Sequence, residues 1–351
     1  MPNENTSSTI HGTPNQSANR AIANWLFTIA AMIFAMIVLG GVTRLTQSGL
    51  SMVEWNPVTG WLPPLNDDVW EEMFAKYRAF PEYQEKNAGM TLGEFKGIFW
   101  FEFLHRLLGR IIGVAFFVPY LFFVLKGWVK GGLAWRLGVI FILGGLQGGL
   151  GWFMVKSGLV DRPDVSQYRL AAHLCLALLI YGAILWVALS LITKPSGCSV
   201  SSSFQSAALY LTALIFLTAF SGALVAGLDA GLIYNTFPLM DGELIPDGLM
   251  EMSPGYINLF ENIMTVQFDH RVLAVVTFGA VVLFWFSGRK AGLAPSQSAP
   301  LNYLAVMVFV QIGLGISTLL MVVPVSLGAL HQAGAVVLLG FAIWTAHAVR
   351  S

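Results

Sequence analysis

Hydrophobic residues in this chain form long runs separated by polar stretches. A run of roughly 20 apolar residues crosses about 30 Å of hydrocarbon as a helix, so the pattern predicts transmembrane helices. We expect them at 21–42, 102–125, 133–155, 168–192, 204–227, 268–287, 301–323 and 327–349. The sixth is the least regular, because Asp269 and Arg271 lie at its start, and totals of seven or nine stay open. The predicted fold class is an all-α, polytopic membrane protein with eight transmembrane helices.

The composition supports this class. Of 351 residues, 56% are hydrophobic and 11% are charged, which is far more apolar than a soluble core requires. The net charge is zero without a basic stripe, so the lipid bilayer is the expected partner and nucleic acid is not. Segment 1–20 has one basic residue, Arg20, unlike an organelle transit peptide, and the first run is too long for a signal peptide. Cys175 and Cys198 predict no disulfide framework.

The charges of the connections predict the orientation. The connections after the second, fourth and sixth runs carry Lys and Arg without acids, whereas those after the first and fifth are long and acidic. Short basic loops normally stay in the cytoplasm. We therefore expect both termini in the cytoplasm, with 1–20 as a polar tail, and the long loops outside.

Three segments recur in the same order along the chain. EFLHR at 102–106 resembles QFDHR at 267–271, QGGLG at 147–151 resembles QIGLG at 311–315, and AAH at 171–173 resembles ALH at 329–331. Collinear matches at nearly constant separation indicate a duplicated unit, and an even number of helices per unit makes the copies parallel. We predict two tandem parallel four-helix bundles, 21–192 and 204–351, joined by a linker at 193–203. Glycines in the middle pair would allow close approach of a helix or a cofactor.

Four of the six histidines are expected in the first turns of the even-numbered helices, near the outer face: His105, His173, His270 and His331. A single histidine at such a place often anchors a helix end at the interface. Four at repeat-related positions favour a ligand role, because ionisable groups at membrane depth are usually functional.

Imidazole binds zinc, copper and haem iron. Zinc prefers a compact tetrahedral set and copper prefers nearby thiolates or methionines, whereas single histidines on two helices of a bundle suit a haem between them. The pattern therefore predicts two haem sites, His105 with His173 and His270 with His331. The adjacent Arg106 and Arg271 could pair with haem propionates, or reach water and lipid headgroups.

The halves differ at one informative position. Glu102, three residues before His105, becomes Gln267 in the second half. A carboxyl group beside a haem can move protons or stabilise positive charge, and an amide cannot titrate. This difference predicts chemistry in the first half and electron transfer in the second. The alternative is that Glu102 caps the first turn of its helix.

These residues resemble the haem A synthases of bacteria and mitochondria over nearly the whole chain. The resemblance rests on GGVTRLT at 40–46, SGLS at 48–51, the 102–106 segment, His173, DHR at 269–271 and LHQ at 330–332. Members of the family oxidise the C8 methyl of haem O to the formyl group of haem A for cytochrome oxidase. The outer loops lack the cysteine pairs of some members, and the loop at 44–98 is similar to that of a longer-loop subgroup.

The resemblance implies a role for each candidate residue. His105 and His173, with Arg106, would hold haem O as substrate, and His270 and His331, with Arg271, would hold haem b as cofactor. Glu102 would be the family's functionally important glutamate. The implied location is the inner membrane of a bacterium, and the implied partners are an electron carrier and the farnesyltransferase that makes haem O. The sequence leaves open whether the protein forms a homo-oligomer.

Two other functions remain open on the sequence alone. One is a dihaem b-type cytochrome that takes electrons from quinol without changing its haem. The other is a metal-free transporter or proton relay that uses the histidines and Glu102.

Overall fold

The computed structural model describes residues 14–56, 59–158, 165–193 and 199–350. Over these residues the chain contains helices and loops and no named strand, which confirms the all-α class. His11, Cys198, most of the predicted tail and residues 194–198 of the predicted linker lie outside the described residues.

Eight of the helices are long and apolar enough to cross a membrane, as predicted. They are α1 (Pro14–Leu45), α4 (Leu92–Leu125), α5 (Gly131–Gly158), α6 (Gln167–Ile192), α7 (Ser202–Gly227), α9 (Ile263–Lys290), α10 (Pro295–Leu320) and α11 (Val325–Ala348). The protein is therefore a multi-pass membrane protein. Large apolar side chains such as Val114 and Leu283 remain exposed on the outside of these helices, where lipid would cover them.

The start of α4 corrects the predicted boundary. The helix begins at Leu92 rather than at residue 102, because Thr91 and Glu94 form a capping box that satisfies its first backbone N–H groups. Glu102 therefore lies in the helix interior, and the interpretation that it caps the first turn is wrong. Similarly, α9 begins at Ile263, so Asp269 and Arg271 lie inside the helix.

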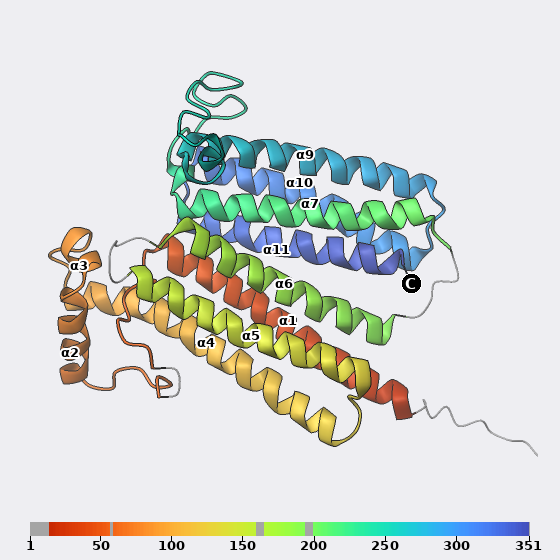
Figure 1. Cartoon of the computed structure of the whole chain (residues 1–351), viewed down its shortest axis with the longest axis horizontal. Coiled ribbons are helices and arrows are strands. Elements are labelled where there is room, and N and C mark those ends of the chain that lie inside the picture. The colour runs from red at the N-terminus through yellow and green to blue at the C-terminus, as the bar shows by residue number, and fades with distance from the viewer. Residues whose placement is uncertain (1–13, 57–58, 159–164, 194–198, 351) are drawn as a thin grey trace, which may run out of the picture.

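The long first loop has structure of its own. It contains α2 (Asp67–Arg78) and α3 (Pro81–Glu85), which lie beside the first turns of α4 (Figure 1). An aromatic cluster joins α2 to α4: Trp70, Phe74, Tyr77, Phe95, Phe99 and Phe103. Burial of these rings explains why α4 continues beyond the predicted membrane segment.

The transmembrane helices pack in two rings. In the first, α1 contacts α4 and α6, and α5 contacts α4 and α6; in the second, α7 and α10 each contact α9 and α11. The rings meet where α1 and α6 contact α11 and α6 contacts α7 (Figure 1). These pairs support the interpretation of two four-helix units, whose boundaries stay a prediction.

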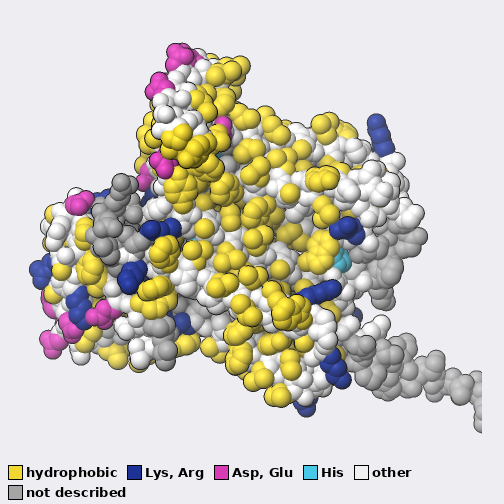
Figure 2. Space-filling view, viewed as in Figure 1, with side chains coloured by type: hydrophobic (Ala, Val, Ile, Leu, Met, Phe, Trp, Pro, Cys, Tyr) yellow, Lys and Arg dark blue, Asp and Glu magenta, His cyan; other side chains and the backbone are white. Residues whose placement is uncertain are grey.

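Charge is unevenly distributed along the helix axes. Acidic side chains gather at the end formed by α2, α3 and the 228–262 connection, which also carries Lys and Arg, whereas the opposite end shows Lys and Arg without acids (Figure 2). The 228–262 connection contains the short helices η1 (Ala230–Leu232), η2 (Gly255–Ile257) and α8 (Asn258–Glu261). We call the end that carries it the loop end. In the predicted topology, the loop end faces outward.

Candidate functional site

The four candidate ligand histidines lie near the loop end. His173 and His331 are the seventh residues of α6 and α11, and His270 is the eighth of α9. His105 lies thirteen residues after Leu92 (105 minus 92), because α4 starts early. The prediction that all four occupy first turns is therefore wrong, although all four lie near the expected end.

Each histidine faces a glycine on a neighbouring helix. A Cβ built on the glycine would lie 2.9 to 3.1 Å from the nearest ring atom, in the pairs Gly40–His105, Gly151–His173, Gly222–His270 and Gly315–His331. Any larger residue would push the imidazole away. Three of these glycines lie five residues before the ends of α1, α7 and α10, and Gly151 lies seven before the end of α5. The four glycines therefore lie within about two helical turns of the ends of their helices, near the loop end.

The second pair has the spacing that a haem iron requires. The ring centroids of His270 and His331 lie 6.5 Å apart, with an interplanar angle of 83°. Two imidazoles that bind one metal through bonds of about 2.0 Å have centroids roughly 6 Å apart. The pair therefore fits axial ligation of one iron.

Neighbouring side chains orient the rings of the second pair. The hydroxyl of Ser221 lies 2.8 Å from Nδ1 of His270. The carboxamide of Gln311 lies 3.1 Å from Nδ1 of His331 and donates to the backbone carbonyl of the same histidine (3.0 Å). Contacts at Nδ1 leave Nε2 of each ring for a ligand role and fix the ring plane.

The first pair is less constrained. Gln147 donates to the backbone carbonyl of His173 (3.0 Å), as Gln311 does to that of His331, but its carboxamide lies 3.4 Å from Nε2 of the His173 ring rather than beside Nδ1. Nδ1 of His173 is buried without a hydrogen-bond partner among the described residues. The repeat spacing between Gly40 and Gly222 places Leu39 opposite Ser221, so His105 has no corresponding hydroxyl group. The first site thus has the same ligand type as the second, with fewer contacts that hold the rings.

Glu102 and Arg106 form a buried clamp on the first outer loop. Oε2 of Glu102 accepts hydrogen bonds from the hydroxyl of Ser51 (2.7 Å) and the backbone N–H of Met52 (2.6 Å). Arg106 donates to Oε1 of Glu102 (2.5 Å) and to the carbonyls of Met52 and Glu54 (both 2.8 Å). Both carboxylate oxygens are therefore occupied by protein donors.

Gln267 and Arg271 form the corresponding clamp in the second half. Arg271 donates to Oε1 of Gln267 (3.0 Å) and to the carbonyls of Tyr234 (2.5 Å) and Thr236 (2.8 Å). The held carbonyls match those of the first clamp, because 234 minus 52 and 236 minus 54 are both 182. The amide of Gln267, however, donates to the carbonyls of Ala230 and Ile233 (2.6 and 2.5 Å).

The Glu102-to-Gln267 difference therefore has a local structural reason. The first loop presents hydrogen-bond donors to its clamp, and a carboxylate accepts them. The second loop presents acceptors, and an amide donates to them. This opposite polarity supports a positioning role for Glu102.

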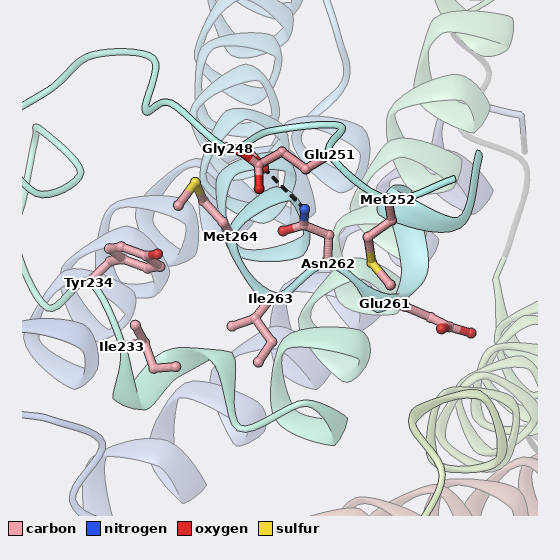
Figure 3. Close-up of a pocket in the computed structure, with 9 residues that line it drawn as sticks. All are labelled: Ile233, Tyr234, Gly248, Glu251, Met252, Glu261, Asn262, Ile263 and Met264. Atoms are coloured by element: carbon pink, nitrogen blue, oxygen red, sulfur yellow. Dashed lines mark hydrogen bonds between the residues drawn. The ribbon is translucent and has the colours of Figure 1, made fainter. Parts of the chain in front are cut away.

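Two cavities lie at the loop end. One, of about 220 Å³, is lined by segment 52–55, Arg106 and the α5 residues Trp152, Val155 and Lys156. The other, of about 370 Å³, lies in the connection between α7 and α9, and its lining includes Tyr234, Glu251 and Glu261 (Figure 3). The first is beside the His105–His173 pair, since Arg106 follows His105 and Gly151 precedes Trp152.

Comparisons with known proteins agree with this arrangement. Residues 23–343 match the family model described as Cytochrome oxidase assembly protein. The chain belongs to the haem A synthase family. It is 52% identical over 337 residues to a protein of Nitrosospira multiformis (95% of each chain) and 54% identical over 329 residues to one of Parvibaculum lavamentivorans (94% of each). A Nitrosomonas eutropha relative is 50% identical over 328 residues (92% of each). All three are named Heme A synthase, which confirms the family predicted from the sequence.

Sequence reasoning missed several residues that shape this haem A synthase site. Gly40 faces the ring of His105 and Gly222 faces the ring of His270. Ser221 contacts Nδ1 of His270. None of these three residues belongs to the recognised repeat. The match between loop residues 52–54 and 234–236, which are 182 residues apart, was also missed. Both clamps bind backbone carbonyls, so the side chains of the two loops can differ. The separation of Gly40 from Gly222, also 182, was the available signal.

Proposed function

We propose that this protein oxidises the C8 methyl group of haem O to the formyl group of haem A, and is therefore an oxidoreductase. The relatives named Heme A synthase support the product. The observation that carries the proposal is the His270–His331 pair, whose 6.5 Å ring separation suits a permanently ligated haem b.

The two halves would divide the work. His270 and His331 would hold haem b, with Ser221 and Gln311 fixing the rings. When bound, that haem would supply one-electron transfer. His105 and His173 would hold haem O, and the less constrained setting of this pair suits a substrate that enters and leaves.

The residues around the first site would position the substrate. Oxidation of the methyl group to a hydroxymethyl group would remove two electrons and two protons and add the oxygen of one water, and a second such oxidation would give a geminal diol that loses water to the aldehyde. The proposed electron carrier would accept the four electrons. Glu102 was predicted to handle protons, and this stays a prediction. Its contacts with Ser51, Met52 and Arg106 support holding segment 51–55 over the site. Propionate pairing by Arg106 and Arg271 also stays a prediction.

The proposed setting is the inner membrane of a bacterium, with both termini in the cytoplasm and the loop end outside. Haem O, an electron carrier and the farnesyltransferase that makes haem O are the proposed partners.

Product analysis tests the function. Haem extracted from cells that carry the gene should contain haem A, and cells without it should accumulate haem O. A dihaem cytochrome would leave the haem composition unchanged, and a metal-free transporter would purify without colour. Either result would overturn the proposal.

A further inference from the structure

The 220 Å³ cavity has walls suited to an amphipathic anion. Segment 52–55 forms one side, and the clamp of Glu102 and Arg106 fixes that segment. The indole rings of Trp55 and Trp152 supply apolar surface. The guanidinium of Arg106 lies 5.4 Å from the Trp55 ring centroid, and Nζ of Lys156 lies 5.0 Å from that of Trp152.

Lys156 is the cation with bonding capacity to spare. Arg106 already donates to two carbonyls and to Glu102. Lys156 is exposed. Its ammonium group lies over the Trp152 ring and has no acidic partner among the described residues. The acid in the lining, Glu54, is paired with Lys76 at 2.7 Å. That pair keeps the pKa of Glu54 below its ordinary value. The cavity therefore favours a negative ligand.

The cavity lies where the edge of a macrocycle held by His105 and His173 would emerge. Arg106 directly follows His105 on α4. On α5, Gly151 contacts His173, and Val155 is four residues further along the same helix face. The lining thus continues from the imidazoles toward the loop end.

The second half has no cation at the position that corresponds to Lys156. The spacing of the Gln147–Gln311 match, 164, places Leu320 at the position of Lys156. The 370 Å³ cavity of that half is lined by Glu251 and Glu261 and by no Lys or Arg (Figure 3). The additional cation therefore belongs to the half proposed for the substrate.

We propose that the 220 Å³ cavity binds the propionate carboxylates of the substrate haem, with Lys156 as their principal ionic partner and Trp55 and Trp152 flanking the macrocycle edge. The inference rests on the proposed function, since it requires a tetrapyrrole dicarboxylate between His105 and His173. It makes Lys156 a substrate-binding residue that selects free carboxylates over neutral analogues.

Optical titration of the purified protein, with haem b in place, tests the inference. The probes are haem O and its dimethyl ester, which keeps the macrocycle and removes both charges. The wild type should bind haem O roughly tenfold more tightly than the ester. Lys156→Leu should raise the Kd for haem O about fivefold and leave the Kd for the ester unchanged. Lys156→Arg should restore most of the preference. Lys130→Leu, the same change at the opposite end of the helices, is the matched control.

The possible results distinguish failure of the carboxylate subsite from failure of the proposed function. Equal affinity for haem O and its ester in the wild type, or an unchanged Kd for haem O in Lys156→Leu, would overturn the carboxylate subsite and leave the proposed function standing. Failure of the wild type to bind haem O while its haem b spectrum is intact would overturn both. The haem b spectrum also reports whether each variant is folded.

Discussion

At the residue scale, the site depends on glycines as much as on histidines. Each of the four imidazoles occupies the space that a side chain would fill on the neighbouring helix. In the family motif at 40–46, Gly40 makes room for His105, and Gly41 makes room for Gln332, whose amide donates to the carbonyl of Ile37 (2.7 Å). The paired glycines thus serve two contacts, one with a ligand and one between the halves.

Gly315→Val should abolish most haem b binding, because its side chain would overlap the ring of His331 and displace it from the iron position. Gly313→Val, on the same helix, is the matched control, because a Cβ at Gly313 would meet no atom within 4 Å. The measurement is the low-spin b-type absorbance per mole of purified protein. His270→Ala and His331→Ala should lose most of this absorbance too. Full retention by both histidine variants would show that the pairing is wrong.

Glu102→Gln should lower haem A production by roughly 10²-fold, the usual scale for losing a positioned acid or base, and haem O should accumulate. The variant should keep haem b. An amide would turn an N–H group toward donors that now bind a carboxylate. Gln267→Glu should spare the proposed chemistry and instead destabilise the second half, because a carboxylate at 267 would face the carbonyls of Ala230 and Ile233, to which the amide now donates. Normal haem A production by Glu102→Gln would show that the carboxyl group of Glu102 is not needed for the reaction.

Ser51→Ala separates the two roles of Glu102, because it removes a donor and leaves the carboxyl group in place. If Glu102 acts by holding the loop, Ser51→Ala should lower the haem A to haem O ratio several-fold. If Glu102 acts only through protons, the ratio should stay at the wild-type value. Extracted haems, separated chromatographically, give the ratio for both variants.

At the scale of elements, α2 is connected to the site through charge. Lys76 of α2 pairs with Glu54, which lines the 220 Å³ cavity, and with Glu72 on its own helix (both 2.7 Å). The hydrogen bond from Lys76 is the main cause of the lowered pKa of Glu54. A lowered pKa means that this contact stabilises the fold above the ordinary carboxyl pKa and is lost as the pH falls through the folded value.

Lys76→Met should raise the pKa of Glu54 toward its ordinary value, about 4.3, so the carboxylate stays ionised at pH 7 and is no longer paired. We expect the Kd for haem O to rise about threefold, because an unpaired negative charge then faces the propionates. Adding Glu54→Gln should restore the wild-type Kd. Glu72→Gln, which removes the partner outside the cavity lining, should change nothing. If the Kd for haem O stays at the wild-type value in Lys76→Met, then α2 does not influence substrate binding.

The sequence predicted the helices and singled out four candidate ligand histidines, because both follow from side-chain type and spacing. The ligand role of these histidines stays a prediction. It could not predict the start of α4, because burial of Phe95 and Phe99 under α2 depends on tertiary packing. It also could not predict the clamps, since Arg106 and Arg271 bind backbone carbonyls, which any residue supplies. Lys156 was passed over because a lysine at a helix end is ordinary until its surroundings are known.

At the scale of the whole molecule, a few side-chain contacts join the two halves. Arg44, at the end of α1, pairs with Asp229 after α7 at 3.0 Å and donates to the carbonyl of Ala226. Gln332 joins α11 to α1. These contacts lie near the loop end, at the depth of the histidines, so the relative placement of the two candidate haem sites depends on them.

The proposed function makes the orientation of the whole molecule important, because it would decide from which side of the membrane haem O arrives. Basic loops at one end and acidic loops at the other predict that the loop end lies outside the cytoplasm. A reporter active only outside the cytoplasm should work when fused near Asp68, in α2, or Asp247, in the 228–262 connection. It should fail near Lys130 or Arg289, at the opposite end.

The reverse reporter pattern would overturn the topology and not the site. The four glycine–imidazole contacts lie near the loop end in either orientation. In the predicted orientation, the residues that line the 220 Å³ cavity lie at the outer end of the helices, so we expect haem O to reach Lys156 and the imidazoles from the outer leaflet. In the reverse orientation it would arrive from the cytoplasmic leaflet. The reporter therefore also identifies the leaflet from which the substrate enters.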